Sequence, residues 1–304
     1  MREAFVRALS ELAEHDGRIM LVNGDLGFGV LTDYVERFPA QYVNAGVAEQ
    51  NMTAVACGMA LTGARAYTYS IGNFPTLRCL EQLRNDVCYH HCDVTVVAVG
   101  GGFSYGQLGV SHFATEDLAM MRSLPGMTVV APSDPWQAYE LTMQLHERGG
   151  PAYLRIDKGS AGMPPGKIEL GKVREVRGGK DAVIFTTGAI LSEAIAAADA
   201  LLDEDVAVRV VDVHTIKPFD ADAVIAAASE CGHVFTLEEH VVTGGLGSAV
   251  AETCAGAALA LKSFQRIGLT DLFPDVVGDQ QYLRARYGLD AVHVQDAVRR
   301  AVAH

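Results

Sequence analysis

The chain has 304 residues, and its 37 acidic side chains outnumber its 24 basic ones, which gives a formal charge of −13. Binding to nucleic acid requires a surplus of basic charge, so the composition excludes nucleic acid as a partner. With 49% hydrophobic and 20% charged residues, the composition is typical of a globular protein with a large core. No apolar run approaches the ~20 residues of a membrane helix, and residues 1–13 do not resemble a signal peptide. We therefore expect no membrane partner and a cytoplasmic protein.

The first half of the chain alternates between helical periodicity and short runs rich in Val and Ile. This alternation is typical of a parallel sheet covered by helices, and it predicts an α/β fold with a doubly wound sheet. The expected helices span residues 2–14, 48–61, 77–89, a segment from 115, and 136–148. The expected strands span residues 19–23, 66–70, 94–99, 128–131 and 152–156.

A length of 304 residues suggests two domains, and a segment rich in turn formers, Lys158 to Gly166, separates them. We expect a first domain over residues 1–162, a linker over 163–180 and a second doubly wound α/β domain over 181–304. The expected strands of the second domain are 182–187, 206–213 and 234–237, and its expected helices are 189–202 and 220–228. The glycines of Thr243–Ser248 open a further helix; an anion site or, with greater weight, a tight turn explains them.

Six cysteines are scattered through apolar surroundings, which indicates buried thiols and no disulfide framework. Only Cys88–Cys92, which also contains His90 and His91, could ligate zinc. A zinc site normally needs a second ligand pair at matching spacing, and the sequence offers none. We therefore expect no metal site in this chain.

One carboxylate, Glu49, lies inside the run of small apolar residues 43–52, at the start of an expected helix. Such a carboxylate is expected to be buried, and a buried charge is costly unless it is hydrogen-bonded. Glu49 is thus either a functional carboxylate that binds a ligand, or a helix-start residue that caps its own backbone or pairs with a nearby arginine.

A second stretch, residues 74–85, places an aromatic side chain before a helix with charged residues. Phe74 could be a stacking platform for a ligand, although filling the core is the commoner role of a phenylalanine. Arg78 and Glu81 could likewise form an ordinary surface pair at helical spacing.

A third stretch is the glycine-rich loop 100–112, which leaves a buried strand and ends at His112. Ligands bind at the carboxyl ends of strands in open α/β sheets, so this loop is a candidate binding segment. Its glycines do not have the spacing GxGxxG, which disfavours a nicotinamide cofactor. A single histidine is more often structural than catalytic, so His112 needs support from its context.

Five motifs supply that context because of their order and spacing. They are Ala48-Glu-Gln-Asn-Met52, residues 74–85, residues 109–122, residues 125–134 and Gly150-Pro-Ala-Tyr-Leu-Arg155. Together the motifs resemble the C-terminal half of the transketolase family, and the resemblance covers essentially all of the chain. The resemblance implies a pyrimidine-binding domain followed by the family's C-terminal domain, which supports dimer packing and carries no catalytic residue.

Members of that family use thiamine diphosphate. The resemblance implies that Glu49 hydrogen-bonds a ring nitrogen of the cofactor's aminopyrimidine and thereby activates the cofactor. It implies that Phe74 stacks on the pyrimidine, with Arg78 and Glu81 in the same cofactor-binding segment. It also implies that His112 faces substrate oxygen and stabilises negative charge or relays a proton.

The family binds the diphosphate through Mg²⁺, using a Gly-Asp-Gly motif and a downstream asparagine in its N-terminal half. Here the only related residues are Gly24-Asp25-Leu26, which lack the third glycine. The resemblance therefore implies that this chain holds half of a site. We expect a separately encoded N-terminal subunit that binds the diphosphate and Mg²⁺, and an α2β2 assembly.

The expected substrate site departs from the family pattern. Arg2 matches one phosphate-binding arginine, while Lys158 stands in place of the second, and lysine lacks its bidentate fork. Leu108 stands where the family has an aspartate that reads a substrate hydroxyl, and Gly29 and Gly100 replace a serine and a histidine. We therefore hypothesise an unphosphorylated or otherwise unusual sugar or aldehyde substrate in at least one half-reaction.

The favoured function is transfer of a two-carbon ketol unit from a ketose to an aldehyde by one subunit of a split transferase. One alternative is a 2-oxo acid dehydrogenase beta subunit, which usually carries Glu-His where this chain has Glu49-Gln50. A second is chemistry like that of deoxyxylulose phosphate synthase, which condenses pyruvate with an aldehyde. A third, from another class, is a non-catalytic scaffold subunit.

Overall fold

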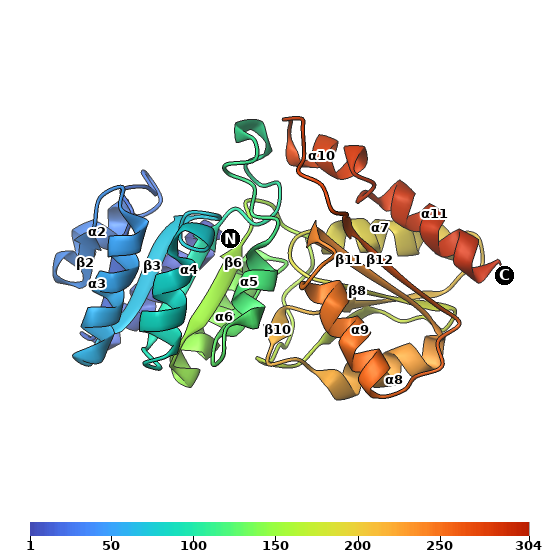
Figure 1. Cartoon of the computed structure of the whole chain (residues 1–304), viewed down its shortest axis with the longest axis horizontal. Coiled ribbons are helices and arrows are strands. Elements are labelled where there is room, and N and C mark those ends of the chain that lie inside the picture. The colour runs from blue at the N-terminus through green and yellow to red at the C-terminus, as the bar shows by residue number, and fades with distance from the viewer. Residues whose placement is uncertain (304) are drawn as a thin grey trace.

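Two α/β domains lie side by side along the long axis of the molecule, and each is built around its own sheet (Figure 1). The computed structural model describes residues 1–303. The predicted fold class, two α/β domains with mainly parallel sheets, is confirmed. None of the helices in the described part of the chain is long and apolar enough to cross a membrane.

The first sheet has seven strands in the order β10-β5-β6-β4-β3-β1-β2. Their bounds are β1 (Ile19–Asn23), β2 (Tyr42–Asn44), β3 (Arg65–Ile71), β4 (Val94–Val99), β5 (Thr128–Val130), β6 (Ala152–Ile156) and β10 (Thr215–Lys217). The central strand β4 is buried along its whole length, as its run of β-branched residues predicts for a sheet covered on both faces. β10 comes from the second half of the chain and pairs antiparallel with β5, so the second half contributes one strand to the first sheet.

Helices cover both faces of the first sheet. On one face lie α1 (Arg2–His15) and α6 (Pro135–Arg148), which pack against each other. On the other lie α3 (Glu49–Leu61), α4 (Leu80–Gln82) and α5 (Asp117–Ser123). The remaining elements are α2 (Thr32–Arg37) and the short turns η1 (Pro39–Gln41), η2 (Leu77–Cys79), η3 (Leu83–Cys88) and η4 (Gly106–Leu108).

Residues 77–89, expected as one helix, instead form a 3-10 turn (η2), a short α-helix (α4) and a π-helical segment (η3). The carbonyl oxygen of Asp86 in the π-helical segment accepts hydrogen bonds from the buried thiols of Cys57 and Cys92, at 3.3 and 3.5 Å. Contacts with α3 therefore accompany the change of helix type, and hydrophobic periodicity does not report such contacts.

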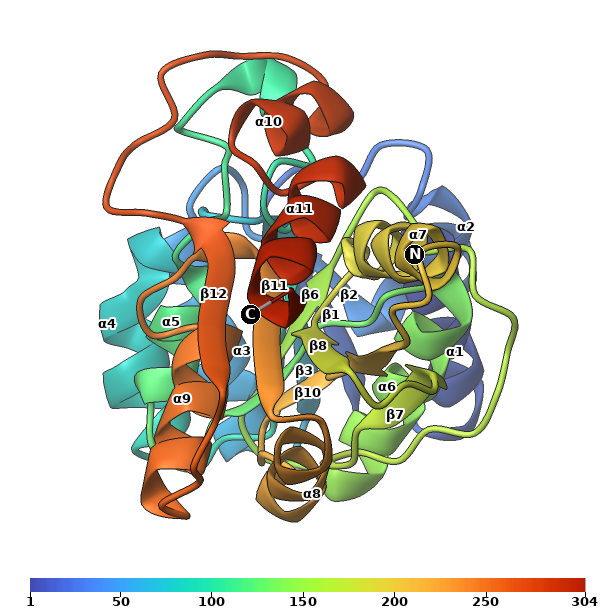
Figure 2. The same ribbon diagram turned by 90° about the vertical axis from the view of Figure 1, so that its right-hand side faces the viewer.

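The second sheet has five strands in the order β12-β11-β8-β9-β7. Their bounds are β7 (Arg174–Arg177), β8 (Ala182–Thr186), β9 (Val208–Asp212), β11 (His233–Val241) and β12 (Ser263–Leu269). α7 (Leu191–Leu202) and α11 (Ala291–Val302) pack on one face, and α8 (Ala221–Cys231) and α9 (Leu246–Gly256) on the other (Figure 2). α10 (Gln280–Arg286) precedes α11. β7 lies inside the segment 163–180, which corrects the expectation of a simple linker for residues 174–177.

The two domains pack against each other. One apolar cluster includes Leu118 and Met121 of α5 together with Leu246 and Val250 of α9. Lys217 of β10 donates hydrogen bonds through Nζ to the carbonyl oxygens of Arg122 and Leu124. α5, which follows the loop after β4, therefore lies at a packed domain boundary.

The glycine-rich start of α9 already holds an anion from the chain itself. The carboxylate of Glu238 is fully buried and accepts hydrogen bonds from the backbone N–H groups of Leu246 and Gly247, each at 2.7 Å. A negative charge is favourable at this end of a helix. The backbone N–H groups of the turn expected at Thr243–Ser248 thus bind a carboxylate of the chain itself.

All six cysteines are free and buried. The sulfur atoms of Cys57 and Cys92 lie 3.2 Å apart, while His90 and His91 are exposed. No group of three or more His, Cys, Asp or Glu side chains within residues 1–303 is arranged to hold a metal ion.

Candidate functional site

Glu49 is the first residue of α3, and only 2% of its surface is exposed. Its Oε2 atom accepts a hydrogen bond from Nη1 of Arg78 at 2.6 Å. The Arg78 side chain is about half exposed, so the guanidinium reaches from the surface into the site. The pair with an arginine, which the sequence left open as an alternative, is therefore present. It balances the carboxylate charge and leaves the other oxygen, Oε1, for a ligand.

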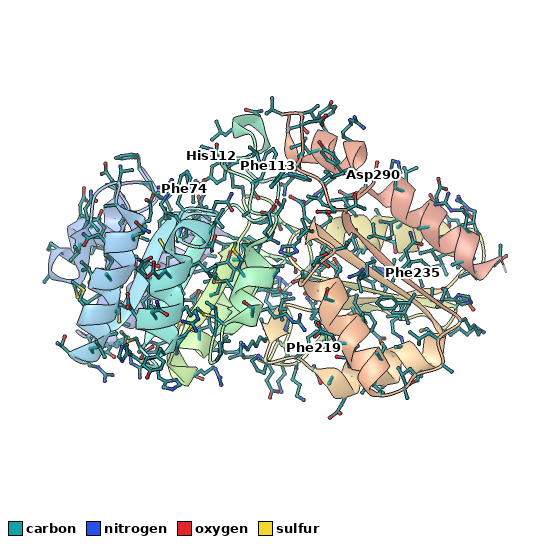
Figure 3. All side chains as sticks on the ribbon, in the orientation of Figure 1. Phe74, His112, Phe113, Phe219, Phe235 and Asp290 are labelled. Carbon is teal, nitrogen blue, oxygen red and sulfur yellow. The ribbon has the colours of Figure 1, made fainter. Side chains whose placement is uncertain are left out.

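Phe74 lies between Arg78 and His112. The Arg78 guanidinium carbon is 4.7 Å from the centre of the Phe74 ring, and the His112 ring meets the same phenylalanine edge to face at 5.2 Å. Figure 3 shows Phe74 and His112 next to each other at the upper edge of the first domain. Glu49, Arg78, Phe74 and His112 thus form one continuous series of contacts.

His112 is half-buried on the loop between β4 and α5. Its Nδ1 atom is 3.0 Å from the hydroxyl of Ser111, and its ring lies 6.3 Å from that of Tyr105. Parallel strands end at a common edge of the sheet, and the loop after β4 leaves from that edge. Fold topology therefore brings this histidine to the segment that carries Phe74, which follows the neighbouring strand β3.

Lys158 and Leu108 line a cavity of about 380 Å³ at the domain boundary. The Lys158 ammonium is 4.4 Å from the centre of the Tyr105 ring, and Leu108 is 54% exposed. The second domain closes the cavity with Gly278, Asp279 and Gln280. Tyr105 contacts both Lys158 and His112, so it connects this cavity with the contacts that link Glu49, Arg78, Phe74 and His112.

Arg2 belongs to the same region, whereas Glu81 does not join it. Burial raises the pKa of Tyr105, and the charge of Arg2 opposes this rise, so the two side chains are within electrostatic reach. Glu81 is exposed on α4, and no hydrogen bond connects it with Glu49 or Phe74 among the residues that the structure describes. Sequence reasoning did not single out Tyr105, because nothing but its place in the loop distinguishes it.

The residues around Glu49 fit a flat heterocycle with N–H groups. Glu49 offers a carboxylate and Phe74 an aromatic face, which suits stacking. Two buried side-chain oxygens nearby, Oγ of Ser70 and Oδ1 of Asn73, have no hydrogen-bond partner. A side chain at Gly24 would contact both Ser70 and Glu49, so the glycine leaves this space open. The chemistry of the pyrimidine half of thiamine diphosphate matches this set.

Comparison with known proteins defines the class. The model of the transketolase pyrimidine binding domain matches residues 1–163, and that of the transketolase C-terminal domain matches residues 171–294. The chain belongs to the transketolase family, which confirms the family resemblance seen in its motifs.

Individual relatives include a transketolase subunit of about the same length and a longer enzyme of which the chain spans about half. The chain is 35% identical over 298 residues to the 6-deoxy-6-sulfo-D-fructose transketolase subunit of Clostridium sp., covering 97% of this chain and 92% of the relative. It is 36% identical to the 1-deoxy-D-xylulose-5-phosphate synthase of Syntrophotalea carbinolica, covering 99% of this chain but 48% of the relative. A solved split-gene transketolase, described as an inactive beta4 tetramer, has a TM-score of 0.88 and 34% identity, covering 99% of this chain and 97% of that one.

Proposed function

We propose that this chain is the pyrimidine-domain subunit of a split transketolase that transfers a two-carbon ketol unit from a ketose donor to an aldehyde acceptor. The observation that carries the proposal is the buried carboxylate of Glu49, in one series of contacts with an aromatic face and a loop histidine. The relatives support it, because a subunit of nearly the same length is a named transketolase subunit.

The proposed cofactor is thiamine diphosphate, shared with a partner subunit that holds the diphosphate and Mg²⁺. When bound, it supplies the carbon nucleophile that carries the two-carbon unit. Glu49 accepts a hydrogen bond from its aminopyrimidine, and Arg78 orients the carboxylate through a hydrogen bond to Oε2 at 2.6 Å. Phe74 supplies the stacking face.

His112 is proposed to act on substrate oxygen. Ser111 engages Nδ1, which leaves Nε2 as the ring nitrogen that faces the substrate. From that atom His112 donates a proton or hydrogen bond to the oxygen on which negative charge develops, and takes the proton back when the product leaves.

The partner subunit is proposed to complete the site in an α2β2 assembly. Support comes from the sequence, in which Gly24-Asp25-Leu26 lacks the family's Gly-Asp-Gly motif. Support also comes from the solved relative of nearly the same length, whose beta4 tetramer is described as inactive. A neighbouring gene that encodes Gly-Asp-Gly and a downstream asparagine is the partner to test.

The substrate is proposed to be a sugar that is unphosphorylated or otherwise unusual in at least one half-reaction. Lys158 and Leu108 border the same cavity. The resemblance implies that they stand where the family has an arginine and an aspartate. The subunit from Clostridium is named for a sulfonated sugar, which supports an unusual substrate group in this proposal. Turnover of both fructose 6-phosphate and xylulose 5-phosphate at the rate of an ordinary transketolase would contradict the proposal.

A second candidate is condensation of pyruvate with an aldehyde. It is favoured by the 36% identity over 306 residues to a 1-deoxy-D-xylulose-5-phosphate synthase. Release of CO₂ from pyruvate by the reconstituted complex, without ketol transfer from any ketose, would select this candidate.

Glu49→Gln tests the proposed function directly. In the complex with the partner subunit, the variant is expected to lose more than about 90% of the activity, because an amide cannot supply the charge-assisted hydrogen bond. Glu140→Gln is the matched control, since Glu140 is exposed on α6 at the opposite face of the sheet. Full activity of Glu49→Gln, with the control also active, refutes the role of Glu49.

A further inference from the structure

The loop that carries His112 is pinned at its base. Gly102 and Ala114 form an isolated antiparallel bridge, with N–H to O distances of 2.8 Å from Gly102 and 3.0 Å from Ala114. His112 lies two residues before Ala114, next to this bridge in the chain. The loop then rises as η4 beside α10 (Figure 1), where the N–H of Gly278 donates to Gly106 O at 3.2 Å.

One side chain of the second domain holds this bridge. Glu239 of β11 is 4% exposed, and its Oε1 atom accepts a hydrogen bond from the backbone N–H of Phe103, the residue after Gly102. The contact is close enough that a Cβ atom on Gly102 would lie 2.4 Å from Oε1. Only glycine therefore allows Glu239 to reach the base of the loop.

Buried arginines fix Glu239 and the other side of the bridge. Arg284 donates from Nε to Oε2 of Glu239 at 2.5 Å. Arg155 donates from Nη2 to the carbonyl oxygens of Ala114 and Glu239, at 2.8 and 3.0 Å. The loop base, β6 and β11 are thus joined through charged groups that are almost completely buried, where such bonds are strong.

A second carboxylate, Glu193, binds the same arginine as Glu239 but, within residues 1–303, does not contact the loop, so it serves as a control. Glu193 of α7 is also buried, at 7% exposure, and its Oε1 atom accepts from Arg284 at 3.4 Å. Its Oε2 atom accepts from the N–H of Ala291 and has no contact with the loop among the described residues. The two carboxylates share one arginine, but only Glu239 touches the segment that leads to His112.

We propose that Glu239 is a positioning residue: by fixing Phe103 and the Gly102–Ala114 bridge, the second domain sets the place of His112 in the substrate site. The inference deepens the proposed function and rests on it for the role of His112. The C-terminal domain therefore acts on the substrate step as well as on packing.

The test compares Glu239→Gln with Glu193→Gln in the complex with the partner subunit. A glutamine at 239 has one acceptor oxygen and no charge, so it cannot keep both the hydrogen bond from Phe103 and the one from Arg284, and the anchor of the loop is weakened. Glu193 contacts Arg284 and Ala291, so the same change there removes no contact with the loop. Three quantities are measured: kcat, the Kd of thiamine diphosphate with Mg²⁺, and deuterium uptake of residues 100–116 in the full chain. Gly102→Ala provides a second disturbance of the same contact in case Glu239→Gln does not fold.

The expected result for Glu239→Gln is a kcat lowered at least about 10-fold, a cofactor Kd within about 2-fold of the wild type and faster deuterium uptake in 100–116. Glu193→Gln is expected to match the wild type in all three quantities. Equal kcat and equal uptake for the two variants overturn the proposal. If the wild-type complex shows no ketol transfer, or His112→Ala keeps its full rate, the proposed function fails instead, and deuterium uptake alone then decides whether Glu239 positions the loop.

Discussion

Asp212 at the end of β9 makes folding depend on pH. The side chain is fully buried at the domain boundary, and its Oδ2 atom accepts hydrogen bonds from Gln137 at 2.6 Å and Ser133 at 3.2 Å, while Oδ1 has no partner. Burial raises the pKa of this carboxyl from 3.8 to about 6, against the opposing effects of the two hydrogen bonds and of the charge of Arg174.

The sign and size of the effect follow from this pKa. A folded-state pKa above that of the unfolded chain means that the folded state holds the proton more tightly, so the stabilisation is complete below pH ~4 and is lost as the pH rises through about 6. A difference of about 2 pKa units corresponds to about 3 kcal/mol. Asp212→Asn carries no proton to lose, so its unfolding free energy minus that of the wild type is expected to rise by about 3 kcal/mol between pH 4 and pH 7.

Urea unfolding at a series of pH values measures this difference, followed by the fluorescence of Trp136, the single tryptophan. Trp136 lies on α6, one residue before Gln137, so its signal comes from the same boundary. Comparing how the unfolding free energies of variant and wild type change with pH removes any pH-independent cost of replacing the carboxyl group with an amide. Asp199→Asn, at an exposed surface pair with Arg177, is the control and should show no such rise. A difference that stays constant within about 1 kcal/mol for Asp212→Asn refutes the reasoning.

Three further predictions concern a buried histidine, the start of α9 and the cavity at Lys158. Burial lowers the pKa of His214 to about 4 from 6.5, so its stabilising effect is present above pH 6.5 and is lost as the pH falls. In urea unfolding, the free energy of unfolding of His214→Gln minus that of the wild type should rise by about 3 kcal/mol between pH 7 and pH 4. A difference that does not change with pH contradicts this. Glu238→Gln should cost about 2 kcal/mol of unfolding free energy, because one charged hydrogen bond at the start of α9 is lost. The control Glu252→Gln, at an exposed position, should cost less than about 1 kcal/mol. Equal losses argue against a stabilising role of the Glu238 carboxylate at this helix. Leu108→Asp adds a hydrogen-bond acceptor at the rim of the Lys158 cavity and should lower the KM of a polyhydroxylated donor about 10-fold at unchanged cofactor Kd; an unchanged KM places the substrate elsewhere.

Much of the fold was predictable because it depends on local pattern. The strands β1, β4 and β6 have the bounds that their apolar runs predicted, and α3 and α6 differ by one residue at their starts. α11 was not predicted, although its buried residues Val294, Ala297 and Val298 follow helical spacing that could have revealed it.

Other elements depend on contacts that a local pattern does not contain. β10 has only three residues and exists because it pairs with β5 of the other half of the chain. The π-helical turn η3 occurs where the Asp86 carbonyl meets two thiols from other segments. Both features arise from long-range packing, which outweighs local propensity.

The sequence predicted which residues form the candidate site, but not which side chains they contact. Family motifs pointed to Glu49, Phe74 and His112, and the structure joins these three through Arg78 and ring contacts. The anchoring of the loop by Glu239 could not be predicted, because the hydrogen bond to Phe103 connects residues 136 positions apart.

The central claim is that this chain holds half of a thiamine diphosphate site. A calorimetric titration of thiamine diphosphate with Mg²⁺ tests it, first into the chain alone and then into the chain purified with its partner subunit. Binding to the pair with no binding to the chain alone is the predicted result. Tight binding to the chain alone contradicts the claim, because the diphosphate would then have a site in this chain, and absence of binding to both contradicts a thiamine enzyme.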